Sequence, residues 1–159
     1  EEAGRKMRLP AEAIRALVDS VDIPSSTFAS YGDFGPGNLI GSVDGKVYLI
    51  DPPVDPAPAL FHRDLGNFVF ELRRQLAGHG YTRTKPVVGR LDGLRAAFLG
   101  GYSQTLGDAD VGLVALFEMR RAAGMARKRL PGRPGDAIWF ARSALARRGE
   151  VKRLAAQLE

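Results

Sequence analysis

The chain has 159 residues, the length of one domain with room for a fair core. Charged residues make up 26% and hydrophobic residues 45%, which is ordinary for a globular protein. Cysteine is absent, so disulfides and thiolate metal sites are excluded. No apolar run approaches the roughly 20 residues that span a bilayer, and we expect a cytoplasmic protein without a membrane span.

The net charge of +5 is unevenly distributed. Residues 1–110 carry 12 basic and 14 acidic side chains, a net of −2, whereas residues 111–159 carry 11 and 4, a net of +7. A basic end is found in proteins that bind nucleic acid, an anionic membrane surface or an anionic substrate, and more often it is only a solvated helix face. The best candidate for nucleic-acid contact is RRAAGMARKRLPGR, residues 120–133. It lacks interleaved aromatic residues, so a nucleic-acid partner is not expected.

Hydrophobic periodicity predicts one hairpin within a mostly helical, α+β domain. The expected helices cover residues 10–21, 60–77, 91–102, 110–127, 137–148 and 150–158. Two apolar, β-branched runs, 39–43 and 46–50, flank Asp44-Gly45, which indicates a two-residue hairpin turn. The following DPPVDPAPA, residues 51–59, predicts an extended link because of its prolines. Asp108, Asp110 and Asp136 are placed to cap helices.

The predicted turn sets the register of the hairpin. If Asp44-Gly45 is the whole loop, Val43 faces Lys46 and Asn38 faces Asp51, with Cβ atoms about 4.5–5.5 Å apart. A carboxylate and an amide oxygen at that distance can share one hard cation such as Mg²⁺. Asp33 lies five residues before Asn38, in a loop of glycines and a proline that can fold back over the same point. The sequence therefore predicts that Asp33, Asn38 and Asp51 form one site.

The stretch YGDFGPGNLIGSVDGKVYLID, residues 31–51, combines D-x-x-x-x-N, a short hairpin and a second Asp. This layout resembles the catalytic loop and metal-binding Asp of protein kinases. The residues themselves more closely resemble the aminoglycoside phosphotransferase family. That family's loop commonly reads H-G-D-x-x-P-x-N, and Tyr31 stands here where its His is usual. The helix sequence HRDLGNFVFEL also resembles the family's D-L-A helix, with its Asp matching Asp64. The resemblance covers about residues 28–77, while residues 78–159 match only in being helical.

The resemblance implies a mainly helical kinase-like C-terminal lobe. Residues 1–77 would form the catalytic loop and metal-site core, and residues 78–159 a helical substrate-side subdomain. Nothing in the chain resembles the glycine-rich strands and the phosphate-pairing Lys of an N-lobe, so we expect that lobe before residue 1.

The resemblance also assigns roles to four residues. Asp33 would be the catalytic base that receives the proton of the attacking hydroxyl, and Asn38 and Asp51 would be the Mg²⁺ ligands. Asp64 would anchor the catalytic loop by accepting hydrogen bonds from its backbone. The cofactors would be ATP and Mg²⁺.

The expected function is transfer of the γ-phosphoryl group of ATP to a hydroxyl of a small molecule, such as a sugar, an aminoglycoside or a related metabolite. The net charge of +7 over residues 111–159 favours a neutral or anionic acceptor over a polycation. Two alternatives are an atypical protein kinase on the same fold and a catalytically inactive, basic helical binding module.

Overall fold

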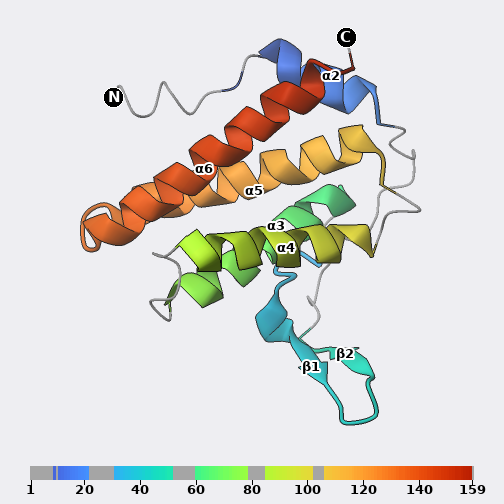
Figure 1. Cartoon of the computed structure of the whole chain (residues 1–159), viewed down its shortest axis with the longest axis vertical. Helices are drawn as coiled ribbons and strands as arrows, with labels where there is room; N and C mark the ends of the chain where they lie inside the picture. The colour runs from blue at the N-terminus through green and yellow to red at the C-terminus, as the bar shows by residue number, and fades with distance from the viewer. Residues whose placement is uncertain are drawn as a thin grey trace. The chain divides into compact units, whose positions relative to one another are not determined.

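A computed structural model describes residue 9 and residues 11–21, 31–51, 60–78, 85–101 and 106–158, with backbone alone for residues 76–78 and 85–88 (Figure 1). The elements in chain order are α2 (Ala11–Asp19), the 3-10 turn η1 (Pro36–Asn38), β1 (Leu39–Gly41), β2 (Val47–Leu49), α3 (Phe61–Gly78), α4 (Lys85–Gly100), α5 (Asp108–Arg129) and α6 (Pro134–Ala155). This part of the chain is mainly helical with one small antiparallel sheet, which confirms the α+β class. None of its helices is long and apolar enough to cross a membrane. The predicted extended link lies outside the described residues from 52 to 59.

The chain divides into two compact units. One comprises residues 1–23 and 105–159, and the other comprises residues 24–104. Helix α4 groups with α3 and the hairpin in the second of these units. We describe each unit by itself.

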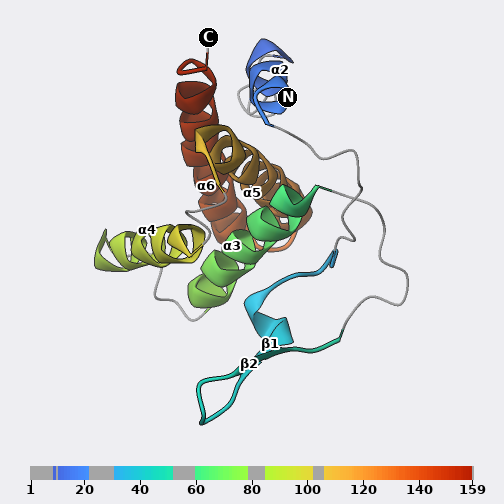
Figure 2. The ribbon, with the colours of Figure 1, turned by 90° about the vertical axis from the view of Figure 1, so that its right-hand side faces the viewer.

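In the first unit, α5 and α6 lie side by side and are joined by a short turn (Figures 1 and 2). Many of the buried residues of the two helices are small, which favours close approach of helix backbones: Ala109, Ala115, Ala122, Ala126, Ala137, Ala144 and Ala155. Helix α2 packs against both helices, and the side chain of its Leu17 is fully buried. Leu17 lies directly over Gly112 of α5, where even a Cβ atom would collide with it.

Helix α6 corrects one prediction, because the two expected helices over 137–148 and 150–158 form a single helix. Gly149 lies inside it, and a helix tolerates one glycine at a cost of about 1 kcal/mol. The buried side chains of Val151 and Leu154 repay that cost by continuing the apolar face. The helix begins earlier than predicted, with Pro134 in its first turn and Arg133 as the N-cap, so Asp136 is a first-turn residue and not the cap.

Two other helix starts also differ from the sequence prediction. Helix α4 begins at Lys85, six residues before the predicted start at 91. In α5 the N-cap is Gly107, whose N–H donates to Oδ2 of Asp110 at 2.7 Å. Asp110 therefore caps the helix from within its first turn, and Asp108 is the first helical residue.

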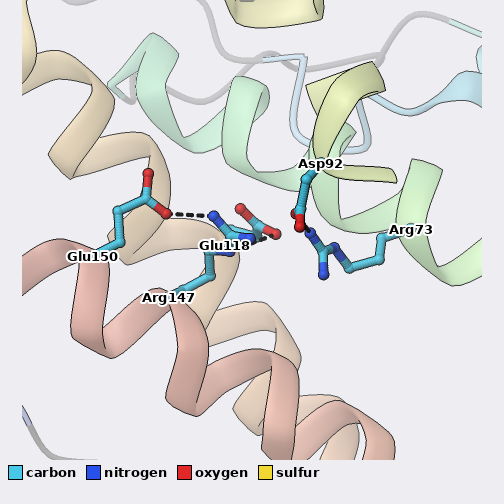
Figure 3. Close-up of polar contacts among 5 residues, drawn as sticks. All are labelled: Arg73, Asp92, Glu118, Arg147 and Glu150. Carbon is cyan, nitrogen blue, oxygen red and sulfur yellow. Dashed lines mark hydrogen bonds and ion pairs between the residues drawn. The ribbon is translucent and has the colours of Figure 1, made fainter. Parts of the chain in front are cut away.

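Within each unit, an ion pair that includes a buried side chain connects two helices (Figure 3). Glu118 of α5 is almost fully buried, and Arg147 of α6 places its Nε 3.5 Å from Oε1 of Glu118 while Nη1 bonds to Glu150. In the other unit, Nη2 of the buried Arg73 on α3 lies 2.6 Å from Oδ1 of Asp92 on α4. Each pair fixes the position of one helix against its neighbour.

In the second unit, the core forms along one face of α3. Leu65, Phe68 and Val69 are buried there, as the apolar spacing predicts. Phe68 stacks on Phe98 of α4 with ring centroids 4.2 Å apart, and its other neighbour is Phe34, 4.9 Å away, from the loop before the hairpin. This aromatic row attaches the loop of residues 31–38 to the helices.

Candidate functional site

The hairpin is present, but its register differs by one residue from the prediction. The paired residues are Leu39 with Leu49, Ile40 with Tyr48, and Gly41 with Val47. The turn closes through a Ser42 N–H bond to the Lys46 carbonyl at 2.8 Å and a Gly45 N–H bond to the Ser42 carbonyl at 3.1 Å. The loop therefore has three residues, 43–45, and ends on Gly45 with φ of +80°. This is the turn plus left-handed glycine of a three-residue hairpin, which competes with the two-residue Asp-Gly turn.

The new register removes the predicted pairing of Asn38 with Asp51. The Ile50 N–H donates to the Asn38 carbonyl at 2.9 Å, so Asn38 stands opposite Ile50 and Asp51 lies one residue beyond the ladder. In a regular strand that shift would turn the Asp51 side chain to the other face of the sheet. The backbone at Asp51 is not regular, however, since its φ is +60°. Strand alternation therefore no longer determines where the Asp51 carboxylate points.

Tyr31 holds the backbone at Asp51. Its hydroxyl donates to the Asp51 carbonyl at 2.7 Å and also contacts the Ile50 carbonyl. A phenol has one proton, so the two carbonyls share a single donor. A non-glycine residue in the left-handed region costs about 1 kcal/mol or more and persists only where neighbours fix it. The Tyr31 hydroxyl supplies such a constraint at the end of the hairpin.

Asp64 in the first turn of α3 anchors the other end of the loop. Its Oδ2 accepts the Tyr31 N–H at 2.7 Å and its Oδ1 accepts the Gly32 N–H at 3.0 Å. The bend that exposes both N–H groups uses the left-handed conformation of Gly32, with φ of +76°. Asn67, one turn along α3, adds a hydrogen bond of 3.3 Å from its side-chain amide to the Gly32 carbonyl. The contact expected for Asp64 is thus present.

Asp33 and Asn38 are joined within the loop. The Asn38 side-chain amide donates to the Asp33 carbonyl at 2.9 Å, and the Asn38 N–H donates to the Gly35 carbonyl at 3.0 Å across η1. The amide nitrogen of Asn38 therefore faces the loop, which leaves its amide oxygen as the group that can serve a cation. The Asp33 residue is exposed to solvent.

The pKa of Tyr31 is affected by both acidic residues, Asp51 and Asp33. Partial desolvation raises the pKa of the Tyr31 phenol, and the negative charges of Asp51 and then Asp33 raise it further. Both carboxylates therefore act on the same hydroxyl, and the phenol stays protonated as a donor at neutral pH. The structure brings Asp33 and Asn38 into contact and links Asp51 to them through Tyr31.

A magnesium site here would use one carboxylate, that of Asp51, and the amide oxygen of Asn38. Both are hard oxygen donors, which suit Mg²⁺ when water and phosphate oxygens complete its octahedron. No group of three or more His, Cys, Asp and Glu side chains that could hold a metal occurs in the described ranges. The donor set fits a metal shared with a bound phosphate and not a metal held by the protein alone.

Sequence reasoning missed two contributors to this site. The hydroxyl of Tyr31 is one, because the sequence indicated only that Tyr31 stands where the family's His is usual. Asn67 is the other, and its signal was available: it follows Asp64 by three residues on a helix, so both side chains lie on one face.

No protein-family model matches this chain, and it has no significant match among curated proteins or among solved structures. The functional interpretation therefore depends on the residues and contacts of the site.

Proposed function

We propose that the protein is an ATP-dependent phosphotransferase that acts on a hydroxyl group of a small molecule, with a kinase-like arrangement around residues 31–64. The observation that supports this most is the bidentate anchoring of the loop backbone by Asp64. Phosphoryl transfer depends on positioning and on charge stabilisation more than on covalent chemistry. A loop fixed at Tyr31 and Gly32 presents the adjacent Asp33 from a stable backbone.

In this proposal Asp33 accepts the proton of the acceptor hydroxyl as its oxygen attacks the γ-phosphorus. Asn38 and Asp51 bind Mg²⁺, which supplies charge neutralisation at the nucleotide phosphates when it is bound. Tyr31 keeps the backbone at Asp51 in its left-handed conformation and so sets the position of that ligand. Asp64 and the Asn38 amide keep Asp33 and Asn38 in one rigid turn.

The proposed acceptor is a neutral or anionic hydroxyl compound. The excess of basic residues over residues 111–159 disfavours a polycationic aminoglycoside, because like charges repel. The chemical identity of the acceptor is left to a substrate screen with ATP.

Paramagnetic broadening with Mn²⁺ and ATP tests the metal assignment, because Mn²⁺ takes the same oxygen ligands as Mg²⁺. We expect the amide signals of residues 31–38 and of Asp51 to broaden first. Asp51→Asn should abolish this selective broadening, whereas Asp33→Asn should leave it intact. Asp44→Asn is the matched control, because Asp44 is exposed on the same hairpin and Asn-Gly suits a turn as well as Asp-Gly does.

Phosphoryl transfer from ATP to a mixture of sugars and sugar acids, measured on the full-length protein, tests the role of the base. Asp33→Asn should lower turnover by about 10²- to 10⁴-fold, since that is the usual contribution of general base catalysis. Equal broadening in Asp51→Asn and in the parent protein, or equal turnover in Asp33→Asn and in Asp44→Asn, would refute the proposed function.

A further inference from the structure

The turn that joins α5 and α6 carries a dense positive charge, and none of its residues takes part in catalysis or metal binding in the proposed function. Residues 119–135 contain six basic residues and no acidic residue: Arg120, Arg121, Arg127, Lys128, Arg129 and Arg133. Arg127, Lys128 and Arg133 are exposed. Basic residues in the last turn of α5 complement the helix dipole, but that effect is confined to the last turn and does not require Arg133 beyond it.

An exposed apolar residue lies among these basic residues in the sequence. Leu130 is 62% exposed, and it follows Arg129 directly at the end of α5. Ile138, one turn into α6, is 54% exposed, and Leu145 lies on the same side of that helix, seven residues on, with Arg142 between them. The outward face of α6 and the turn thus combine leucine and isoleucine side chains with arginines and a lysine.

Such a mixture fits an anionic membrane surface better than a nucleic acid. Headgroups with negative charge attract clustered Lys and Arg, and an apolar tip can enter the boundary between headgroups and acyl chains. Single-stranded nucleic acid is bound by exposed aromatic side chains together with a charged groove. Residues 119–138 contain no aromatic residue, and Trp139 and Phe140, which follow them, are half-buried and buried. The turn lies at the end of the α5–α6 pair away from α2, so it protrudes from its own unit (Figures 1 and 2).

We infer that the α5–α6 turn, with the outward face of the first half of α6, binds the surface of membranes rich in anionic lipid. The contact is peripheral: the cations lie over the headgroups, and Leu130 enters the interface. All residues of this surface lie in the unit of residues 1–23 and 105–159, and none of them has a role in the proposed phosphotransferase site.

Sedimentation with vesicles tests this inference. The probe is phosphatidylcholine containing about 30% phosphatidylserine, compared with phosphatidylcholine alone, at about 0.15 M ionic strength. We expect binding to the anionic vesicles only. The triple variant Arg127→Gln/Lys128→Gln/Arg133→Gln should bind about 100-fold more weakly, from roughly fivefold for each cation near the surface. Leu130→Ser, which keeps every charge, should bind about tenfold more weakly because it loses the apolar contact.

A control with the same change in net charge separates a local site from general attraction. Arg15→Gln/Lys152→Gln/Arg153→Gln removes three exposed cations from the same unit at the other end of the helices, and its binding should fall by no more than a few-fold. Equal losses in the two triple variants would overturn the inference. So would unchanged binding of Leu130→Ser, or tighter binding of a single-stranded oligonucleotide of about 20 nucleotides than of anionic vesicles. Circular dichroism of each variant verifies that the exposed substitutions leave the helices intact.

Discussion

At the level of single residues, two side chains that hold the candidate site have no part in the chemistry proposed for it. Asp64 fixes the loop before Asp33, and the Tyr31 hydroxyl fixes the backbone at Asp51. The residue types at 33, 38, 51 and 64 could be selected from the sequence because their spacing is distinctive. The role of Tyr31 could not, because a hydroxyl bond to a carbonyl 20 residues away depends on a fold that periodicity does not specify.

Tyr31→Phe tests the hydroxyl of this residue with minimal change in shape. The variant keeps the ring but loses the bond to the Asp51 carbonyl, so the Asp51 ligand should relax from its left-handed backbone conformation. We expect turnover to fall by about tenfold to hundredfold, as a misplacement of about 1 Å typically costs. Tyr48→Phe, which removes an exposed hydroxyl from the same hairpin, is the control and should retain turnover.

The titration of Tyr31 provides a separate measurement. Because partial desolvation and the charges of Asp51 and Asp33 raise its pKa, the phenol should titrate above 10. The difference in absorbance near 295 nm between the parent protein and Tyr31→Phe isolates this titration. Asp51→Asn should move its midpoint downwards. The neutral phenol is favoured in the fold, so its donor bond persists below pH 10 and is lost as pH rises through the raised pKa; an unmoved midpoint would contradict the proximity of Asp51.

Asp64→Ala tests the anchor. Two backbone N–H groups lose a charged acceptor, and each such bond is worth roughly 1.5–3 kcal/mol. We expect the amide protons of Tyr31 and Gly32 to exchange with solvent at least tenfold faster, measured by NMR, while amides within α5 are unaffected. Asp19→Ala, a change to an exposed aspartate in α2, is the control.

At the level of elements, the hairpin and the helices were predictable but some of their boundaries and the register were not. Two apolar runs around Asp-Gly indicated a hairpin, yet two- and three-residue turns are both compatible with that dipeptide. The choice between them decided which residue faces Asn38. Helix α6 was divided in the prediction because Gly149 weakens the helical pattern, whereas packing of Val151 and Leu154 overrides that local preference.

Gly45→Ala tests the three-residue turn. An alanine at φ of +80° costs about 1–2 kcal/mol, so the Ile50 amide, which bonds across the hairpin to Asn38, should exchange with solvent about tenfold faster. Gly41→Ala is the control, because an added Cβ there meets open space and the backbone has no positive φ. Equal effects of the two substitutions would argue against a left-handed Gly45.

The close approach of α2 to α5 can be tested in the same way. Gly112→Ala places a Cβ against the buried Leu17, and overpacking of a core costs about 1–3 kcal/mol. Gly124→Ala on the same helix faces open space and should stabilise the protein by about 0.5–1 kcal/mol. Urea denaturation of both variants should therefore give free energies of unfolding that change with opposite signs.

At the level of the whole molecule, the α+β class followed from composition and periodicity, because one hairpin among amphipathic segments leaves few other options. The division into two units did not follow, since it depends on which segments pack together. Residues 1–23 pack with residues 105–159, across more than 80 intervening residues. No local pattern in the sequence predicts that these two segments pack together.

The buried ion pair between Glu118 and Arg147 can be tested by its effect on the stability of the whole protein. Arg147→Leu removes one ion-pair partner of the buried Glu118, and breaking a buried ion pair typically costs about 3–5 kcal/mol. The double variant Glu118→Leu/Arg147→Leu should recover much of that loss. Arg142→Leu, at an exposed position of the same helix, should change the free energy of unfolding by less than about 0.5 kcal/mol. A double variant less stable than Arg147→Leu would show that the pair does not act as a unit.

The Asp64 contact has a kinetic consequence. It joins residues 33 positions apart, and closing a chain segment of that length carries an entropic penalty that grows with its logarithm. Helix α3 forms from contacts between near neighbours, so its first turn can exist before the loop of residues 31–38 finds it. The Asp64 carboxylate would then already be in place, and the loop of residues 31–38 would acquire its shape late in folding. A substitution that weakens the start of α3 should therefore lower the fraction of molecules in which the loop of residues 31–38 is correctly folded. Most of the helical circular dichroism of the protein should still be intact.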